Sequence, residues 1–334
     1  MRYEDAGVSV GRGNEIVNFL KGLFGNKDIG PFASSLNLDY ILKEYSSPSF
    51  IFSCDGVGTK ILLHKKYHTM RYAAQDLIAM NANDIATVGA KPVVFFDYIG
   101  IDKVLLSSDV KDFFAGLKDT LSSIGCRLGG GETAEMPDIY LDGTLDLAGF
   151  VVGVVDREKQ IGPQRVKIGD ILVALSSSGI HSNGFSLVRK LLDNRLDPMQ
   201  RLKSGENLID VLLKPTRLYV NQTLHLSENP YVHAAVHVTG GGLVENPPRV
   251  TPEGMEIVID KKWEIPEIFD VIKKEAKMDE MEMMKTFNMG VGFIYLVAPE
   301  GVSKVLKCLE DMGEKPFIIG EVKKAEGDHR IRFR

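Results

Sequence analysis

Apolar residues recur along this chain at two spacings, and each spacing predicts one type of element. Short apolar runs rich in β-branched and aromatic residues predict strands at residues 50–53, 92–98, 145–156, 171–175, 236–239, 291–298 and 317–322. Apolar positions that repeat every three or four residues predict helices at 14–24, 71–88, 110–124, 185–193, 208–213, 216–227 and 300–312. Strands and helices therefore alternate, which is typical of layered α/β proteins.

The length of 334 residues is enough for two domains. A stretch containing Gly, Pro, Arg and Lys at residues 162–169 separates two series of alternating elements. We therefore expect the fold class to be α/β or α+β. The N-terminal domain, residues 1–165, should hold a mixed sheet with helices, and the C-terminal domain, residues 166–334, should be an α/β sandwich.

Composition and charge narrow the class of protein. Apolar residues make up 44% of the chain and charged residues 25%, as in soluble globular proteins. The formal net charge of −5 argues against nucleic acid or an acidic membrane as the partner. No apolar run approaches the roughly 20 residues that span a bilayer, and residues 1–5 do not resemble a signal peptide. Three scattered cysteines without a C-x-x-C pair argue against disulfides, so we expect a cytoplasmic protein.

Three segments of the N-terminal half combine acids with glycines or amides. The first follows the strand at 50–53 and contains the candidate nucleotide ligands Asp55, Gly56, Gly58, Thr59 and Lys60. Bare glycine amides can approach a phosphate closely, and a carboxylate can hold the accompanying Mg²⁺. The spacing is not that of a Walker A loop. The alternative is a Gly-rich hairpin with a solvated lysine.

The second segment places Gly129, Gly130 and Gly131 directly before Glu132. It offers backbone amides for phosphate and a carboxylate for Mg²⁺ within one short stretch. The alternative is a tight turn before a helix that Glu132 and Thr133 cap.

The third segment is the helix expected at 71–88. At about 100° per residue, Asp76 and Asn83 fall within roughly 20° of each other, and Asp84 lies about 80° from Asp76. Because burying an unpaired carboxylate costs several kcal/mol, these acids need partners, and a metal ion would be one. The alternative is a helix whose acids simply face solvent.

Two loops of the C-terminal half carry different chemistry. Residues 176–184 join a strand to a helix and include His181, Ser182 and Asn183, and such strand-end loops often bind ligands. Helix capping by Ser182 or Asn183 would explain one of them but not the histidine. In the second loop, the residues Thr239, Gly240, Gly241 and Gly242 lead into a helix and offer an anion site, although close packing alone would also require glycine. His237, just before them, could be an ordinary strand residue with its hydrogen bonds satisfied, which is the commoner role of a lone histidine.

These patterns indicate an ATP-dependent enzyme with a phosphorylated small substrate, and their order resembles the phosphoribosylformylglycinamidine cyclo-ligases, also called aminoimidazole ribonucleotide synthetases. The resemblance covers almost the whole chain. Its blocks are D-G-V-G-T-K at 55–60, N-D at 83–84, G-A at 89–90, F-F-D-Y at 95–98, G-G-E-T-A-E-M-P at 130–137, H-S-N-G at 181–184, S-L-V-R at 186–189, P-T-R-L-Y at 215–219, T-G-G-G at 239–242, E-N at 245–246 and T-F-N-M-G-V-G at 286–292. Departures from the common family residues occur at Cys54, Asn81, Ala82 and Lys91.

The resemblance implies an ATP-dependent ligase of purine biosynthesis that forms a C–N bond. Formylglycinamidine ribonucleotide and ATP would become aminoimidazole ribonucleotide, ADP and phosphate. It also implies a homodimer whose N-terminal sheets join. Members of the wider superfamily commonly hold Mg–ATP with acids placed like Asp55, Asp84 and Glu132.

Within that reaction, we expect phosphorylation of the formyl oxygen. Lys60 would neutralise developing charge, and His181 or His237 would move protons. Asn183 would orient the amidine, while Gly240, Gly241 and Gly242 would hold the ribose phosphate. Asp76 and Asp97 are second choices for contacts to the metal. The alternatives are another ATP-dependent enzyme of the superfamily, such as formylglycinamidine ribonucleotide synthase, and a silent nucleotide-binding subunit.

Overall fold

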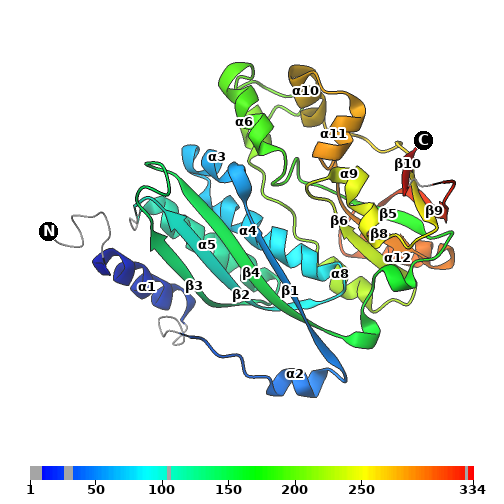
Figure 1. The fold of residues 1–334 in the computed structure, drawn as a ribbon, viewed down its shortest axis with the longest axis horizontal. Helices are drawn as coiled ribbons and strands as arrows, with labels where there is room; N and C mark the ends of the chain where they lie inside the picture. The colour runs from blue at the N-terminus through cyan, green and yellow to red at the C-terminus, as the bar shows by residue number, and fades with distance from the viewer. Residues whose placement is uncertain (1–9, 26–32, 104–106, 328–329) are drawn as a thin grey trace. The chain divides into compact units, whose positions relative to one another are not determined.

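The computed structural model describes residues 10–25, 33–103, 107–327 and 330–334. The chain forms two compact units (Figure 1). The first contains the residues up to Ile85 and those from Lys91 to Asp156, and the second contains Ala86–Ala90 and Arg157–Arg334. No helix in the described ranges is long and apolar enough to cross a membrane.

The first unit is built on a four-stranded mixed sheet with the order β1–β4–β2–β3. The parallel pair β2–β3 is joined by a crossover through α5, and the other two pairs are antiparallel. This arrangement confirms the mixed sheet expected for the N-terminal half. The elements are α1 (Val10–Phe24), α2 (Asp39–Glu44), β1 (Pro48–Gly56), α3 (Ile61–Lys66), α4 (Met70–Ala86), β2 (Lys91–Ile101), α5 (Ser108–Ser123), β3 (Arg127–Glu135) and β4 (Leu145–Asp156).

This sheet has one covered face and one open face. In Figure 1, α4 and α5 lie behind the strands. Along β4, Leu147 and Val151 are buried, whereas the residue directly before each of them, Asp146 and Phe150, is exposed. This alternation is expected when only one face of a sheet is packed. α4 is buried almost all round, which fits a helix that is rich in alanine and other apolar residues.

β3 is the largest difference between the sequence prediction and the structure of this unit. Gly129, Gly130 and Gly131 lie within a strand, so the alternative of a tight turn before a helix is wrong. A methyl group on Gly129 would collide with the side chains of Val94 and Phe96 on β2. The glycines therefore allow β3 to pack closely against β2, and they are not a turn signal.

The second unit is a six-stranded sheet with the order β10–β7–β9–β5–β8–β6. Its main apolar cluster joins β5, β6 and β8 to α8 and α12. Its strands and helices confirm an α/β second domain, although β7, β10, α10 and α11 were not predicted. The elements are β5 (Ile171–Ser176), α6 (Phe185–Asn194), α7 (Leu208–Leu212), α8 (Val220–Ser227), β6 (Val232–His237), α9 (Gly242–Glu245), β7 (Met255–Ile259), α10 (Glu267–Ala276), α11 (Glu280–Thr286), β8 (Val291–Val297), α12 (Val302–Asp311), β9 (Phe317–Lys324) and β10 (Ile331–Phe333).

α8 begins at Val220, not at residue 216 as predicted. In the segment before it, Arg217 Nη1 and the Tyr219 hydroxyl each donate a hydrogen bond of 2.8 Å to the carbonyl of Ser176. These bonds tie the segment to the end of β5. Its residues therefore remain outside the helix despite their helical spacing.

Candidate active site

Two carboxylates and two glycines alternate in one row across the sheet of the first unit. Asp55 on β1 pairs with Gly149 on β4, and Gly149 pairs on its other side with Asp97 on β2. Asp97 in turn pairs with Gly131 on β3. Residues paired across a sheet share a face. A methyl group on Gly149 would meet Asn81 of α4, so both carboxylates belong to the face that α4 covers.

Asp97 is nearly buried, with 6% of its surface exposed. Burial raises the pKa of its carboxyl to about 7, and the negative charge of Glu132 adds to the shift. The carboxylate lies in the space that a side chain at Gly131 would fill. An acid that ionises near neutral pH beside a strand of glycines is a typical feature of a functional site.

Asp55 is half-buried and held from two directions. Its Oδ1 accepts a hydrogen bond of 2.7 Å from the backbone amide of Gly56. Asn81 on α4 binds the Asp55 backbone amide and carbonyl at 2.9 and 3.1 Å. The next residues, Gly58 and Thr59, are exposed at the end of the strand. This geometry leaves a fixed acid next to accessible backbone.

Lys60 is fully buried, so the alternative of a solvated lysine is wrong. Its Nζ lies 3.0 Å from Oδ1 and 2.8 Å from Oδ2 of Asp76, and His64 Nε2 lies 2.8 Å from the same Oδ2. Burial favours the neutral acid, but the charge of Lys60 and the hydrogen bonds from both residues outweigh it and hold the pKa of Asp76 well below its usual range. Asp76 and Asn83 are fully buried too, so their side chains do not face solvent. The sequence correctly required a partner for Asp76, but that partner is a lysine, and His64 was missed.

The predicted metal ligands are not gathered into a ready-made cluster. Among the residues that the structure describes, no three His, Cys, Asp or Glu side chains lie close enough to hold a metal ion. Glu132 is exposed and pairs with Tyr98 in the row next to Asp97, so its side chain points to the opposite face of the sheet from Asp55 and Asp97. Asp84 is half-buried at the end of α4. Mg²⁺ usually takes only one or two carboxylates and completes its shell with phosphate oxygens and water. Separate carboxylates beside exposed backbone fit that mode of binding.

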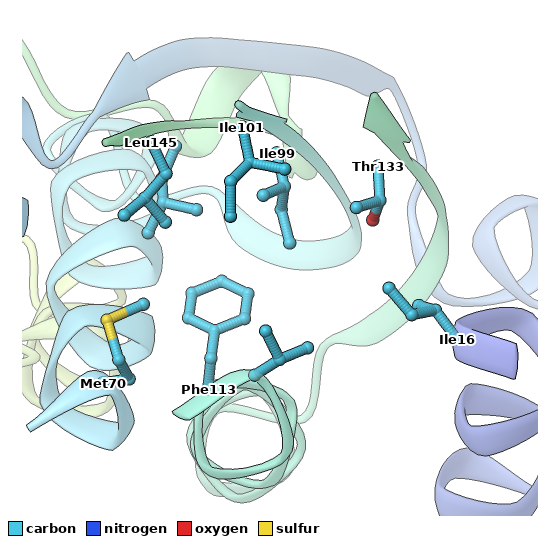
Figure 2. A pocket seen from close by; sticks show the side chains of 9 residues that line it. Ile16, Met70, Ile99, Ile101, Phe113, Thr133 and Leu145 are labelled. Atoms are coloured by element: carbon cyan, nitrogen blue, oxygen red, sulfur yellow. The ribbon is translucent and has the colours of Figure 1, made fainter. Parts of the chain in front are cut away.

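A cavity elsewhere in the first unit does not fit a nucleotide. It lies between α1, α5 and the sheet, and Figure 2 shows apolar side chains such as Ile16, Ile99 and Phe113 around it. Its volume of about 20 Å³ is close to the space of one water molecule. This cavity is therefore too small to hold a nucleotide.

In the second unit, His181 lies in the loop between β5 and α6. It is 1% exposed, has a left-handed backbone with φ 56°, and its Nε2 accepts a hydrogen bond of 3.3 Å from the Ser178 amide. Ser182 Oγ lies 2.9 Å from Thr216 Oγ1. The N-cap residue of α6 is Gly184, which has no side chain with which to cap, so the capping interpretation of Ser182 and Asn183 is wrong. Ser182 and Asn183 therefore lie in the loop before α6 without capping the helix.

The glycine loop at 239–242 lies against this first loop. Asn183 Oδ1 is 3.3 Å from the point where a β-carbon on Gly240 would stand. Asn246 holds the loop by accepting from the Thr239 amide at 2.8 Å and donating to the Gly240 carbonyl at 3.0 Å. The following helix, α9, has only four residues, and the Gly242 amide is used by the Thr239 carbonyl. The helix expected after the glycines is therefore only a single turn, and the amides of Thr239 and Gly242 are already used within the loop.

Two aromatic rings link the candidate histidines. The His181 ring lies 6.2 Å from Tyr219, Tyr219 stacks on Phe293 at 5.0 Å, and Phe293 lies 6.1 Å from His237. The sequence did not single out Tyr219 or Arg217, although both lie in the P-T-R-L-Y block. Arg217 Nη2 donates to both oxygens of Glu314 at 2.7 Å while its Nη1 holds the Ser176 carbonyl. These two residues thus brace the strand end that carries the His181 loop.

Comparison with known proteins identifies the family. Residues 41–155 match the family model of the AIR synthase related protein, N-terminal domain, and residues 167–331 match that of the C-terminal domain. The phosphoribosylformylglycinamidine cyclo-ligase of Brevibacillus brevis is 41% identical over 97% of this chain and 96% of its own. That of Desulfitobacterium hafniense is 40% identical over 96% of each chain.

Solved structures share the fold at lower identity. The hydrogenase maturation protein HypE of E. coli has a TM-score of 0.71 and 18% identity, covering 96% of this chain and 93% of its own. AaThiL complexed with AMPPCP and TMP has a TM-score of 0.60 and 16% identity, covering 100% of this chain and 95% of its own. With its two matching domains and near-full-length relatives, the chain belongs to the phosphoribosylformylglycinamidine cyclo-ligase family of AIR synthase related proteins.

Proposed function

We propose that this chain closes the imidazole ring of aminoimidazole ribonucleotide in purine biosynthesis. It would convert formylglycinamidine ribonucleotide and ATP into aminoimidazole ribonucleotide, ADP and phosphate. The observation that carries the proposal is the identity of about 40% to relatives of that name over nearly the whole chain. The use of ATP is further supported by the fold shared with AaThiL, which was solved with AMPPCP.

The chemistry has two steps. The formyl oxygen attacks the γ-phosphorus of ATP, which releases ADP and turns a poor leaving group into a phosphate ester. The neighbouring amidine nitrogen then attacks the activated carbon, the ring closes, and phosphate leaves. Holding these groups together can supply roughly 7–11 kcal/mol in favourable intramolecular cases. The protein therefore acts mainly by positioning and by neutralising charge.

The first unit holds the nucleotide in this proposal. Mg²⁺ would screen the triphosphate charge, with Asp55 and Asp84 as its protein ligands and Asp97 beside them, whereas Glu132 faces the other side of the sheet. The backbone after β1 and along β3 would approach the phosphates, since glycine leaves it bare. Lys60 and Asp76 contribute through their buried ion pair, which fixes the segment that follows Asp55.

The second unit holds the substrate. Thr239, Gly240 and Gly241 would hold the ribose phosphate through backbone amides and a hydroxyl, and Asn183, adjacent to Gly240, would orient the amidine. His181 is the first choice for the proton transfer, because it lies in the same loop as Asn183. A histidine suits this role since its ordinary pKa is near neutral.

A homodimer in the cytoplasm completes the proposal. The open face of the first sheet carries Phe52 and Phe150, whose rings are 60% and 38% exposed and stack at 6.1 Å. Phe50 and Tyr98 add to the same exposed apolar surface. A contiguous aromatic surface of this kind marks an association site, and a second copy of the sheet would cover it.

One assay tests the function. Purified protein with Mg–ATP and formylglycinamidine ribonucleotide should release ADP and form the aminoimidazole product in equal amounts. Asp84→Asn should abolish turnover and leave the melting temperature intact, whereas Asp142→Asn, an exposed loop acid, should behave as wild type. ADP release without ring closure, or no turnover by the wild type, would refute the assignment.

A further inference from the structure

Asn81 is a fully buried amide whose hydrogen-bonding groups are all engaged. Its Oδ1 accepts from the Asp55 backbone amide at 2.9 Å, and its Nδ2 donates to the Asp55 carbonyl at 3.1 Å and to the Leu77 carbonyl at 2.8 Å. Exchanging the oxygen and nitrogen of this side chain would place donor against donor at the Asp55 amide, so the orientation is fixed. Asn81 thus binds both backbone polar groups of one residue on β1, Asp55, which lies 26 positions before it in the chain.

We propose that Asn81 is a positioning residue that sets the place of Asp55 for binding Mg–ATP. The inference rests on the proposed function, in which Asp55 is a ligand of the nucleotide-bound metal. Asn81 does not touch the nucleotide in this scheme, because its amide is already fully used within the protein. It acts through the backbone of Asp55, while the Gly56 amide orients the Asp55 carboxylate from the other side.

Gly149 supports this assignment independently. It is the partner of Asp55 in the sheet, and a methyl group there would stand 2.7 Å from Asn81 Nδ2. The same methyl group would also collide with the ring of Phe95. The absence of a side chain at Gly149 is therefore what lets the Asn81 amide reach the Asp55 peptide.

The helix that carries Asn81 makes the clamp rigid. α4 is packed on nearly all sides, and its Asp76 holds Lys60 and His64 in the segment that follows Asp55. Two buried polar side chains of one helix, Asn81 and Asp76, thus hold three points of the segment from Asp55 to His64. A small shift of a ligand can reduce a reaction about a hundredfold, so such support has a functional consequence.

The test separates positioning from general stability. Asn81→Ala should raise the KM for Mg–ATP, and the Mg²⁺ concentration for half-activation, by roughly tenfold to a hundredfold. The KM for formylglycinamidine ribonucleotide should stay within about twofold. Asn81→Ser, which keeps one polar group, should lie between Ala and wild type. The control Ile78→Val changes a fully buried residue of the same helix and should lower the melting temperature without changing either KM.

Equilibrium binding of Mg–ATP to the same variants keeps the inference distinct from the proposed function. A wild type that binds Mg–ATP but does not close the ring would refute the function, while the ratio of dissociation constants would still test Asn81. Equal Mg–ATP affinity in wild type, Ala and Ser variants would overturn the inference. So would failure of both variants to fold, because Asn81 would then be a core residue, and a wild type that does not bind Mg–ATP would overturn both proposals.

Discussion

The Asp97 carboxylate occupies the space beside Gly131 that any side chain at that position would need. The two residues are register partners on neighbouring parallel strands, and Asp97 Cγ stands 2.8 Å from the point where a β-carbon on Gly131 would lie. The Asp97 backbone carbonyl is 2.7 Å from the same point. The glycine at 131 and the acid at 97 therefore depend on each other.

Gly131→Ala should displace that carboxylate. We expect a loss of about 1–3 kcal/mol of folding stability from overpacking, together with weaker Mg–ATP binding. The loss should be smaller when Asp97 is also changed to Ala, since part of the collision is removed. Gly22→Ala is a control, because a methyl group there meets no atom within 4 Å. Thermal melts and nucleotide titrations measure both effects, and equal losses in the two backgrounds would contradict the coupling.

Asp97 also predicts a dependence of stability on pH. Burial, with help from Glu132, raises its pKa to about 7 in the folded protein, above the ordinary value of 3.8. The folded state then binds the proton more tightly than the unfolded state, so this contribution is present below about pH 4 and is lost as pH rises towards 7. In metal-free buffer, Asp97→Asn should match the wild type near pH 4 and exceed it by on the order of 2–4 kcal/mol at pH 8. A difference that does not change with pH would contradict the shifted pKa.

Removing one partner of the buried pair of Lys60 and Asp76 should destabilise the first unit strongly, although the intact pair adds little net stability. Lys60→Met leaves a buried carboxylate with its principal charge partner removed and should cost about 3–5 kcal/mol. Lys60→Met combined with Asp76→Leu should recover much of that loss. The matched control is Lys307→Met, because the pair of Lys307 and Asp311 is 74% and 65% exposed and should matter little. Chemical denaturation measures these values, and similar losses at the two sites would contradict the prediction.

The exposed aromatic face of the first sheet predicts association. Phe52→Glu introduces a charge where a second copy would have to bury an apolar ring, so the variant should be monomeric at concentrations where the wild type is a dimer. Met199→Glu alters a side chain with the same exposure of 60% in the second unit and should leave the mass unchanged. Light scattering after gel filtration gives both masses. A monomeric wild type would remove the sheet face as the interface.

The role of His181 can be separated from its backbone conformation. Its φ of 56° is one that asparagine tolerates better than alanine. His181→Asn should therefore fold, lower kcat by about 10²–10⁴, and leave the KM for ATP nearly unchanged. His68, at φ 54° and mostly exposed, provides the matched variant His68→Asn with the same backbone demand. A normal kcat in the His181 variant would contradict its role in proton transfer and leave His237 as the candidate.

Periodicity alone predicts much of the fold. β4 has the bounds 145–156 that its apolar alternation predicts, and α4 differs by one or two residues at its ends. Local patterns fail where a distant partner decides the structure. The glycines of β3 resemble a turn in the sequence, and only the pairing with β2 shows that they form a strand. The start of α8 was predicted too early because the hydrogen bond from Arg217 to Ser176 holds the preceding segment outside the helix.

For the candidate site too, local patterns predicted some residues, and contacts between distant residues decided the others. The acids and glycines were found from the sequence because phosphate and metal binding limits the residue types. The burial of Lys60 could not be predicted, because nothing in the local sequence shows that Asp76 lies against it. The sequence showed Asn81 only as a departure from the family pattern. Its hydrogen bonds to Asp55 could not be predicted without knowing how α4 packs against β1.

The strict alternation of faces along β4 links correct folding to activity. If β4 slipped by one residue against its neighbours, Ala148 or Phe150 would stand where Gly149 now separates Asp55 from Asp97. An aromatic ring would then be pushed towards α4, and the two acids would lose their common row. A molecule with this error would lose the packing of the first unit and the catalytic site together. A misregistered population should therefore lower the fraction of active molecules and leave the activity of each correctly folded molecule unchanged.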